Sequence, residues 1–195
     1  MAVMLVVALL VPVAWLLGTF PSAALVGKAH GRDITREGSG NPGASNTMRV
    51  LGWRAGLLVL LIDIAKGAAA AEVGLAVGGR AGAVVLGAAA VLGHTFPLYR
   101  KGGKGIATAG GALLVLYPLI ALPLAVVWFV VARVLHKASL ASLLCAVLFP
   151  IAVWAFGYAL WEVAATVAIA VFVITRHWAN IRRLLHRQEL GMGRT

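Results

Sequence analysis

The sequence predicts an all-α protein that crosses a lipid bilayer several times, and three observations support this fold class. Hydrophobic residues make up 62% of the 195 residues and charged residues only 12%, whereas soluble domains have roughly half and a quarter. The hydrophobic residues form runs that are long enough to span hydrocarbon. The basic residues are concentrated in the short connections between these runs, as in membrane proteins oriented by charge. One domain over residues 1–195 is expected, because the chain is too short for two membrane domains.

Six apolar runs are candidates for membrane-spanning helices, and the fourth is too long for one crossing. Its 27 residues would form a helix about 40 Å long, and Pro118 and Pro123 interrupt its backbone hydrogen bonding. Two shorter crossings, about Gly105–Tyr117 and Pro118–Val134, are therefore predicted. The six runs are Ala2–Val26, Trp53–Val77, Ala81–Leu98, Ile106–Ala132, Ala138–Phe156 and Leu160–Ile174.

The basic residues decide between six and seven crossings. With the fourth run divided, four polar segments share one face and contain fifteen of the seventeen basic residues, while Arg80 faces the other side. A single crossing would instead place the arginine-rich tail on the opposite face. Because basic residues gather on the cytoplasmic side, we predict seven transmembrane helices with the N-terminus outside and the C-terminus in the cytoplasm. The four segments are Gly27–Arg54, Tyr99–Lys104, Arg133–Lys137 and the tail from Thr175, which includes Arg176 and Arg194.

The first polar segment contains GSGNPGASNTMRVLG, residues 38–52, in which glycines and small polar residues precede one arginine. Gly38, Gly40 and Gly43 permit positive φ and close approach, so that backbone N–H groups can line a concavity. Arg49 offers a bidentate fork to phosphate. The alternative is a glycine-rich turn that only connects two helices. Further hydrogen-bonding candidates are Ser39, Asn41, Ser45 and Asn46.

The second polar segment is GHTFPLYRKGGKGIATAGG, residues 93–111. KGGKG before an apolar run resembles a phosphate-binding loop, in which free N–H groups and the helix dipole attract an anion and Lys104 adds charge. It is not a Walker A loop, because glycine follows the lysine. The alternative is a basic loop that only sets orientation. Candidate binding residues here are His94, Gly102, Gly103, Gly105 and Thr108.

The third polar segment is TRHWANIRRLLHRQE, residues 175–189, where the last apolar run ends. His177 and Asn180 share one helix face at a spacing of three residues, and neither is needed for topology. The neighbouring arginines are typical of a helix that leaves the membrane and contacts lipid headgroups: Arg182, Arg183 and Arg187.

Two further pairs have both a structural and a functional interpretation. Asp63 and Lys66 lie three residues apart inside an apolar run, so they form either a buried structural pair or a functional one. Ser139 and Ser142 begin another run, where they cap the helix or offer a hydroxyl group to phosphate.

Several chemistries are excluded or disfavoured. There is no H-x-x-x-x-D, G-x-S-x-G or H-E-x-x-H motif and no Cys/His cluster, so no metal or cofactor is expected. Basic residues in short loops argue against a nucleic-acid partner. A site with Arg, Lys, Gly, Ser and Asn but few acids favours phosphate groups, and its place at the lipid boundary favours a substrate with an acyl chain. A phosphate-ester transporter and a lipid-binding scaffold are the alternatives.

GSGNPGASNTMR, GHTFP with KGGKGIAT, and RHWANIRRLLHRQE resemble, in this order, the signature segments of the bacterial acyl-phosphate:glycerol-3-phosphate acyltransferases, the PlsY family. The resemblance implies a seven-helix enzyme of the bacterial inner membrane with a cytoplasmic active site. Its reaction would move a fatty acyl group from acyl phosphate to the 1-hydroxyl of glycerol 3-phosphate, giving lysophosphatidic acid, as the first acylation of phospholipid synthesis. A soluble partner would make acyl phosphate from acyl carrier protein, and coenzyme A thioesters would not serve.

The resemblance also implies roles for individual residues. Ser39, Arg49, Lys104, His177 and Asn180 would be catalytic, and Glu189 would support the structure. The substrate is a mixed anhydride, so no acyl-enzyme is needed, and the hydroxyl proton would pass to the donor phosphate, the favoured acceptor, or to His177. Substrate-binding residues would be Gly40, Asn41, Gly43, Ser45, Asn46, His94, Gly102, Gly103, Gly105, Thr108 and Ser142.

Overall fold

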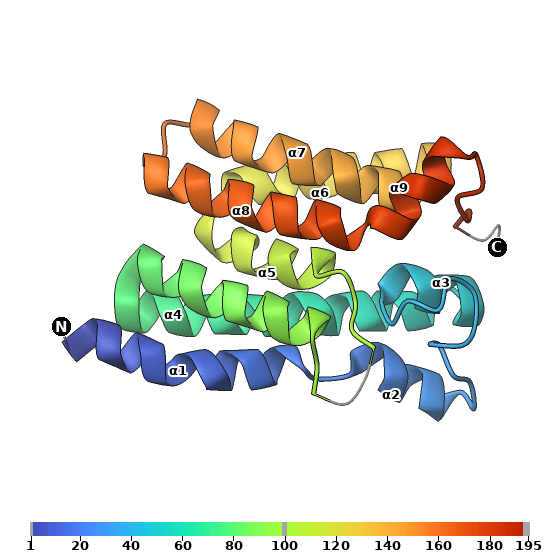
Figure 1. Cartoon of the computed structure of the whole chain (residues 1–195), viewed down its shortest axis with the longest axis horizontal. Helices are drawn as coiled ribbons and strands as arrows, with labels where there is room; N and C mark the ends of the chain where they lie inside the picture. Colours follow the sequence, from blue (N-terminus) through green and yellow to red (C-terminus); the bar gives the residue numbers. More distant parts are fainter. Residues whose placement is uncertain (1, 99–100, 193–195) are drawn as a thin grey trace. The chain divides into compact units, whose positions relative to one another are not determined.

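The computed structural model describes residues 2–98 and 101–192, and every regular element in these ranges is a helix (Figure 1). The prediction of an all-α fold is confirmed. The helices form two compact units, one ending at Leu116 and one beginning at Tyr117. Tyr99 and Arg100 of the second polar segment, and Arg194 of the tail, lie outside the described residues.

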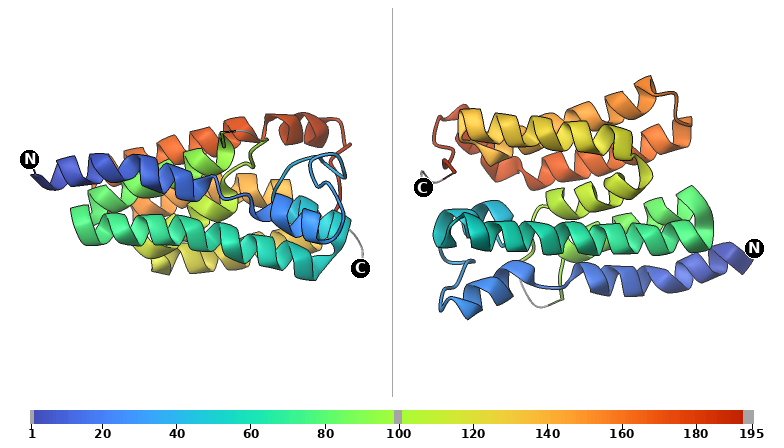
Figure 2. Two further views of the ribbon diagram at one scale, coloured as in Figure 1. Left: turned by 90° about the horizontal axis from the view of Figure 1, so that it is seen from below. Right: turned by 180° about the vertical axis from the view of Figure 1, so that it is seen from behind.

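The first unit contains a long helix that folds back on itself at two glycines. Gly78 and Gly79 leave the helical conformation, and Gly79 has a φ of 61°, which favours glycine. The two halves of this helix lie side by side (Figure 1 and Figure 2), and a Cβ atom on Gly74 would collide with the backbone of Gly82. The elements are α1 (Ala2–Gly18), α2 (Ser22–Ala29), α3 (Ala44–Leu51), α4 (Trp53–Thr95) and α5 (Ile106–Leu116).

The first apolar run, predicted as one segment, is broken between α1 and α2. Pro21 lies in the break and has no N–H group to continue the helical hydrogen bonding. The Phe20 carbonyl next to it accepts a hydrogen bond from Lys66 Nζ of α4 at 3.3 Å. The break thus supplies a polar group to a lysine that lies within an apolar helix.

Small residues let the helices of the first unit approach closely. A Cβ on Gly18 of α1 would overlap the backbone of Ala90, and a Cβ on Gly67 would overlap that of Thr108 in α5. Such contacts between small residues are characteristic of helix packing in membranes. They fix the ends of α4 and α5, to which the second polar segment is attached.

Up to residue 192, where the described part of the chain ends, the second unit has four helices: α6 (Pro118–Leu135), α7 (Ala138–Ala155), α8 (Leu160–Arg176) and α9 (Trp178–Leu185). The helix break predicted before Pro118 is confirmed, because α5 ends at Leu116 and Tyr117 is not helical. Pro123, by contrast, lies inside α6. The chain bends by 61° between α8 and α9, at His177.

Among the described residues, four helical stretches are long and apolar enough to cross a membrane, and the bent pair α8–α9 would be a fifth. At 43 residues, α4 would be about 65 Å long if straight, more than twice the thickness of the hydrocarbon core. Its two halves therefore fit two crossings. Seven crossings, with the N-terminus outside and the C-terminus in the cytoplasm, stay a prediction. The four stretches are Ala2–Ala29, Trp53–Thr95, Pro118–Leu135 and Ala138–Ala155.

Candidate active site

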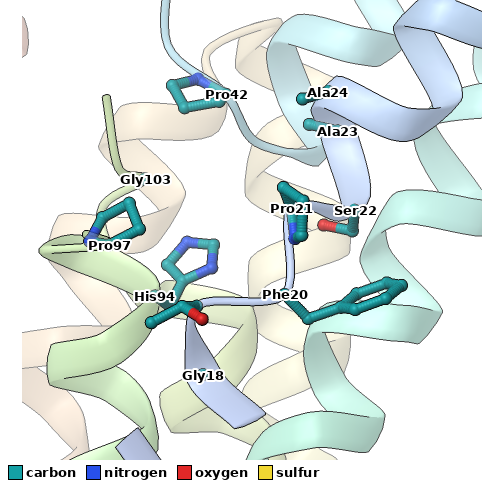
Figure 3. A pocket seen from close by; sticks show the side chains of 11 residues that line it. Gly18, Phe20, Pro21, Ser22, Ala23, Ala24, Pro42, His94, Pro97 and Gly103 are labelled. Carbon is teal, nitrogen blue, oxygen red and sulfur yellow. The ribbon is translucent and has the colours of Figure 1, made fainter. Parts of the chain in front are cut away.

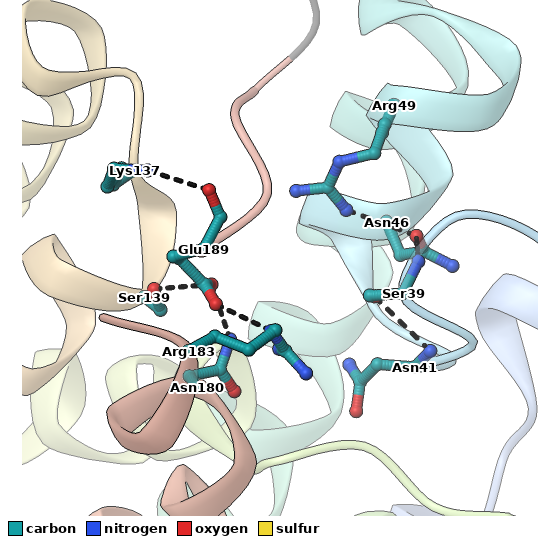
Figure 4. A network of polar contacts seen from close by, with 9 residues as sticks. All are labelled: Ser39, Asn41, Asn46, Arg49, Lys137, Ser139, Asn180, Arg183 and Glu189. Carbon is teal, nitrogen blue, oxygen red and sulfur yellow. Dashed lines mark hydrogen bonds and ion pairs between the residues drawn. The ribbon is translucent and has the colours of Figure 1, made fainter. Parts of the chain in front are cut away.

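The first polar segment is organised around the side chain of Asn46, in the first turn of α3 (Figure 4). This buried amide oxygen accepts hydrogen bonds from the Ser39 backbone N–H at 2.8 Å and from Arg49 Nη1 at 3.1 Å. The amide nitrogen donates to the carbonyls of Ile34 and Glu37 at 3.0 and 2.9 Å. Both donors and both lone pairs of the amide are thus used within the chain. The geometry favours a positioning role for Asn46, which shapes the loop and orients Arg49.

The glycines of this segment have two different functions. Gly38 and Gly40 have φ values of 59° and 64°, so the positive φ predicted for them is confirmed. The expected concavity of backbone N–H groups is not formed, because the N–H groups of Ser39, Gly40 and Gly43 donate to acceptors within the segment. Gly43 is extended, with a φ of −153°, and serves as the N-cap residue of α3, so the expected positive φ is not used there. The hydroxyl of Ser39 accepts a long hydrogen bond of 3.4 Å from the N–H of Asn41.

In the second polar segment, three glycines allow the chain to pack tightly against the end of α4. The Gly103 N–H donates to the His94 carbonyl at 3.1 Å, and a Cβ on Gly103 would overlap the His94 ring. A Cβ on Gly102 would overlap the Thr95 carbonyl, and Gly105 has a φ of 83°. Lys104 is therefore held directly before the N-terminus of α5, where the helix dipole favours an anion.

The first and second polar segments meet within the first unit. Lys101 Nζ lies 3.4 Å from the position that a Cβ on Gly40 would occupy. Pro42 of the first segment also lines a pocket together with His94 and Gly103 of the second, beside the α1–α2 break (Figure 3). Glycine-rich backbone and basic side chains from two distant parts of the sequence are thus combined.

A buried polar network lies next to this pocket. Asp63 Oδ1 accepts hydrogen bonds from Ser22 Oγ at 2.7 Å and from Lys66 Nζ at 2.8 Å. Lys66 Nζ is also 2.7 Å from His94 Nδ1. The predicted pairing of Asp63 with Lys66 is present, and the structure extends it to His94. Ser22 and this extension were missed, because no local pattern connects residues that lie so far apart in the sequence.

The third polar segment is held by Glu189 in the second unit (Figure 4). Its carboxylate accepts hydrogen bonds from Ser139 Oγ at 2.7 Å, Asn180 Nδ2 at 2.6 Å and Arg183 Nε at 2.8 Å. Burial opposes ionisation of Glu189, but these three hydrogen bonds outweigh it and hold the pKa of Glu189 below its ordinary value. Such contacts are what a supporting role for Glu189 requires, and they fix Asn180 as well.

His177 lies at the bend between α8 and α9 and is buried. Its Nδ1 is 2.8 Å from the Val173 carbonyl, which can only accept, so Nδ1 carries a proton. A neutral His177 then has an unprotonated Nε2. The ring has the tautomer that a proton acceptor needs.

The remaining predicted binding residues, Ser142, Thr108 and Ser45, differ in their surroundings. The Ser142 hydroxyl donates to the Ala138 carbonyl at 2.9 Å and accepts from Trp128 Nε1 at 3.0 Å, which favours a structural role over phosphate binding. The predicted capping of α7 is not observed, because its N-cap residue is Lys137, whose side chain makes no capping hydrogen bond. Thr108 is fully buried, and its hydroxyl has no hydrogen-bond partner within the described residues. Ser45 is partly exposed in the first turn of α3.

Comparison with known proteins agrees with these features. The family model described as glycerol-3-phosphate acyltransferase matches residues 8–187. The chain belongs to the glycerol-3-phosphate acyltransferase family. The glycerol-3-phosphate acyltransferase of Bacillus velezensis is 38% identical over 188 residues, covering 95% of this chain and 97% of that protein. The Geobacillus kaustophilus enzyme is 40% identical over 185 residues, covering 93% and 94%.

Two crystal structures of the family superpose on the chain with 34% sequence identity. Both are of PlsY (YgiH), an integral membrane glycerol 3-phosphate acyltransferase. The glycerol 3-phosphate form has a TM-score of 0.90 and matches 96% of both chains. The lysophosphatidic acid form has a TM-score of 0.88 and matches 96% of this chain and 95% of the other. The resemblance to the PlsY family is confirmed, and this chain is an integral membrane acyltransferase of phospholipid biosynthesis.

Proposed function

We propose that this family member transfers a fatty acyl group from acyl phosphate to the sn-1 hydroxyl of glycerol 3-phosphate. The products are lysophosphatidic acid and inorganic phosphate. The family membership supports the acceptor, since a related crystal structure is a glycerol 3-phosphate form and another is a lysophosphatidic acid form. The observation that carries the proposal is the meeting of the glycine-rich 38–43 loop with the KGGKG loop inside the first unit, beside Arg49 and Lys104.

Each loop suits a phosphate group. The KGGKG loop leads into the N-terminus of α5, so Lys104 and the backbone N–H groups in the first turn of that helix bind the phosphate of glycerol 3-phosphate. Arg49, oriented by Asn46, and the loop around Ser39 bind the phosphate of the donor. Two anionic substrates repel each other, and these cations offset the repulsion. Holding both substrates in attack geometry supplies on the order of 7 kcal/mol of barrier lowering.

In the reaction, the sn-1 hydroxyl oxygen attacks the carbonyl carbon of the mixed anhydride. A new C–O ester bond forms, the C–O bond to phosphate breaks, and the hydroxyl proton passes to the departing phosphate. Arg49, Lys104 and the N–H groups at the start of α5 stabilise negative charge that develops on the carbonyl and phosphate oxygens. No acyl-enzyme forms and no metal takes part. If His177→Gln lowers turnover severely and shifts its pH profile, His177 is the proton acceptor instead.

The reaction takes place on one side of the membrane. The three polar segments act at the cytoplasmic face of the bacterial inner membrane, and His177 and Asn180 of the second unit act on the same reaction. Acyl phosphate is supplied by a soluble enzyme that makes it from acyl carrier protein. The concentration of basic residues in the segments predicted to be cytoplasmic supports this orientation.

The test is a two-donor assay with purified protein in detergent. With palmitoyl phosphate and glycerol 3-phosphate, we expect release of phosphate and formation of 1-acyl-glycerol 3-phosphate, identified by mass spectrometry and NMR. Palmitoyl-coenzyme A should give no product at equal concentration. Product from the thioester alone would contradict the proposed donor, and product acylated at the second carbon would contradict the position.

A further inference from the structure

We propose that His94 is a neutral hydrogen-bond donor to the phosphate of bound glycerol 3-phosphate, and that the buried Asp63–Lys66 pair fixes its tautomer. The inference rests on the proposed function, because it assigns a further contact to the same acceptor substrate. It gives a role in substrate binding to two charged residues that lie within an apolar helix.

The ammonium group of Lys66 has a hydrogen-bond acceptor for each of its protons. A lysine ammonium group has three N–H donors and no acceptor. Three acceptors surround Lys66 Nζ: Asp63 Oδ1 at 2.8 Å, His94 Nδ1 at 2.7 Å and the Phe20 carbonyl at 3.3 Å. The ammonium group is therefore saturated, and each of its protons has a defined partner.

The contact with Lys66 determines which nitrogen of the His94 ring carries the proton. An ammonium group can only donate, so His94 Nδ1 must be unprotonated to accept from Lys66. The proton of the neutral ring is then on Nε2. Asp63 Oδ1 lies 3.7 Å from Nδ1, too far for a hydrogen bond that would favour the other tautomer. Ser22 Oγ holds the same carboxylate oxygen at 2.7 Å and so fixes the far end of the network.

The Nε2 proton of His94 points toward the KGGKG loop. A Cβ on Gly103 would overlap His94 Nε2, so this nitrogen lies directly over the KGGKG loop. His94 also borders the pocket that includes Pro42 of the first polar segment, and Figure 3 shows its ring between the α1–α2 break and Gly103. Within the described part of the chain, Nε2 donates to no protein acceptor. The proton is offered on the side where the proposed function places a phosphate.

The burial of the network explains why a fixed tautomer matters. The side chains of Asp63, Lys66 and His94 are 2%, 4% and 8% exposed. A charged pair costs free energy inside apolar surroundings and is retained where it serves a purpose. Here it keeps an imidazole neutral beside a basic loop and aims one N–H group at an anion. A second conformation of the ring would need Lys66 to lose a hydrogen bond.

The direct test is NMR of the wild-type protein with 15N-labelled histidine in detergent. The chain has five histidines, and the spectrum of His94→Gln assigns the signal of His94. Long-range 1H–15N correlations should show the Nε2–H tautomer, and glycerol 3-phosphate should shift the His94 signal. An Nδ1–H tautomer or an imidazolium would overturn the inference. The inference would also be overturned if saturating glycerol 3-phosphate left the His94 chemical shift unchanged while the same sample turned over palmitoyl phosphate.

Kinetics of a matched pair of variants give the second test. A glutamine amide nitrogen reaches the position of Nε2, whereas that of asparagine reaches only the position of Nδ1. His94→Gln should keep KM for glycerol 3-phosphate within about threefold, and His94→Asn should raise it roughly tenfold or more, with kcat little changed. Equal KM values, or losses in kcat alone, would overturn the contact. Failure of the wild-type protein to use palmitoyl phosphate at all would instead contradict the proposed function.

Discussion

Asp63 in the first unit and Glu189 in the second are buried carboxylates with closely similar partners. Each accepts a serine hydroxyl at 2.7 Å, from Ser22 and Ser139 respectively. Each also has a basic partner at 2.8 Å: Lys66 for Asp63, and an arginine for Glu189. The local chemistry of the two networks is therefore almost the same.

The two networks differ in what they connect. Asp63 and Lys66 lie on one helix, and their third member is the His94 ring, which faces the KGGKG loop. Glu189 instead ties the tail to the start of α7 and to α9, and Lys137 Nζ adds a hydrogen bond of 2.7 Å to its backbone carbonyl. With the role proposed for His94, the Asp63 carboxylate prepares a side chain for the substrate, whereas the Glu189 carboxylate holds the tail in the fold. The same contacts thus serve function or stability according to what lies at their far end.

The largest expected effect is on the free energy of unfolding, and it should differ between substitutions of Asp63 and Glu189. Asp63→Asn leaves the Lys66 ammonium buried without a counter-charge, and Lys66 is only 4% exposed. We expect a loss of about 3–5 kcal/mol in the free energy of unfolding. Glu189→Gln should cost less, about 1.5–3 kcal/mol, because the side chain of Arg183 is 31% exposed and can turn to water.

Equilibrium unfolding in mixed detergent micelles measures both losses. Asp33→Asn is the matched control, since Asp33 is exposed, and its unfolding transition should stay close to that of wild type. If Glu189→Gln loses as much stability as Asp63→Asn or more, the deeper burial of the Asp63–Lys66 pair does not determine the cost of removing the charge.

The next largest expected effect is on kcat/KM, which should fall on substitution of Arg49 but not of Arg183. Arg49 donates to an amide oxygen within the proposed phosphate site, whereas Arg183 donates to the Glu189 carboxylate. Arg49→Lys keeps the charge but removes the planar fork, so kcat/KM should fall roughly a hundredfold, about 2.7 kcal/mol. Arg183→Lys should keep kcat/KM within about threefold. Steady-state phosphate release from palmitoyl phosphate measures both, and near-wild-type kinetics of Arg49→Lys would refute its role.

The smallest effect is the pH dependence of stability. Because the pKa of folded Glu189 lies below its ordinary value of 4.5, the unfolded chain takes up the proton first. The stabilisation is therefore complete above the unfolded pKa and is lost as the pH falls through the folded pKa. Between about pH 6 and about pH 4, Tm should fall more in wild type than in Glu189→Gln. Parallel Tm profiles would show that the Glu189 network contributes no linked stability.

The sequence predicted the helical class, the helix break before Pro118 and the pairing of Asp63 with Lys66. These features follow from local spacing, hydrophobicity and proline chemistry. The break at Pro21 was missed, although Pro21 and the neighbouring Thr19 and Ser22 are local signals, because the run was assigned on its overall hydrophobicity. Its consequence, a carbonyl offered to Lys66, depends on a contact between two helices and could not be predicted from spacing.

The candidate site was predicted as a set of residues but not as a set of roles. Composition indicated that Asn46 and Ser142 have hydrogen-bonding groups, and only the structure shows that their partners are mostly backbone. Likewise, His94 alone in a sequence does not reveal which nitrogen is used. Glu189 was predicted by resemblance, and its partner Ser139 was predicted as a helix cap or as a hydroxyl group offered to phosphate, not as a partner of a carboxylate.

The proposed reaction requires the polar segments to lie on one side of the membrane, since both substrates must be reached from one compartment, and labelling tests this directly. Single cysteines at Lys101 and His186, in a Cys145→Ala background, can be probed with a membrane-impermeant maleimide. Ala159→Cys, in the connection between α7 and α8, is the control for the opposite face. Lys101→Cys and His186→Cys should react only in inside-out vesicles, and Ala159→Cys should react only in intact spheroplasts. Labelling of Lys101→Cys and His186→Cys from opposite sides would contradict the proposed reaction.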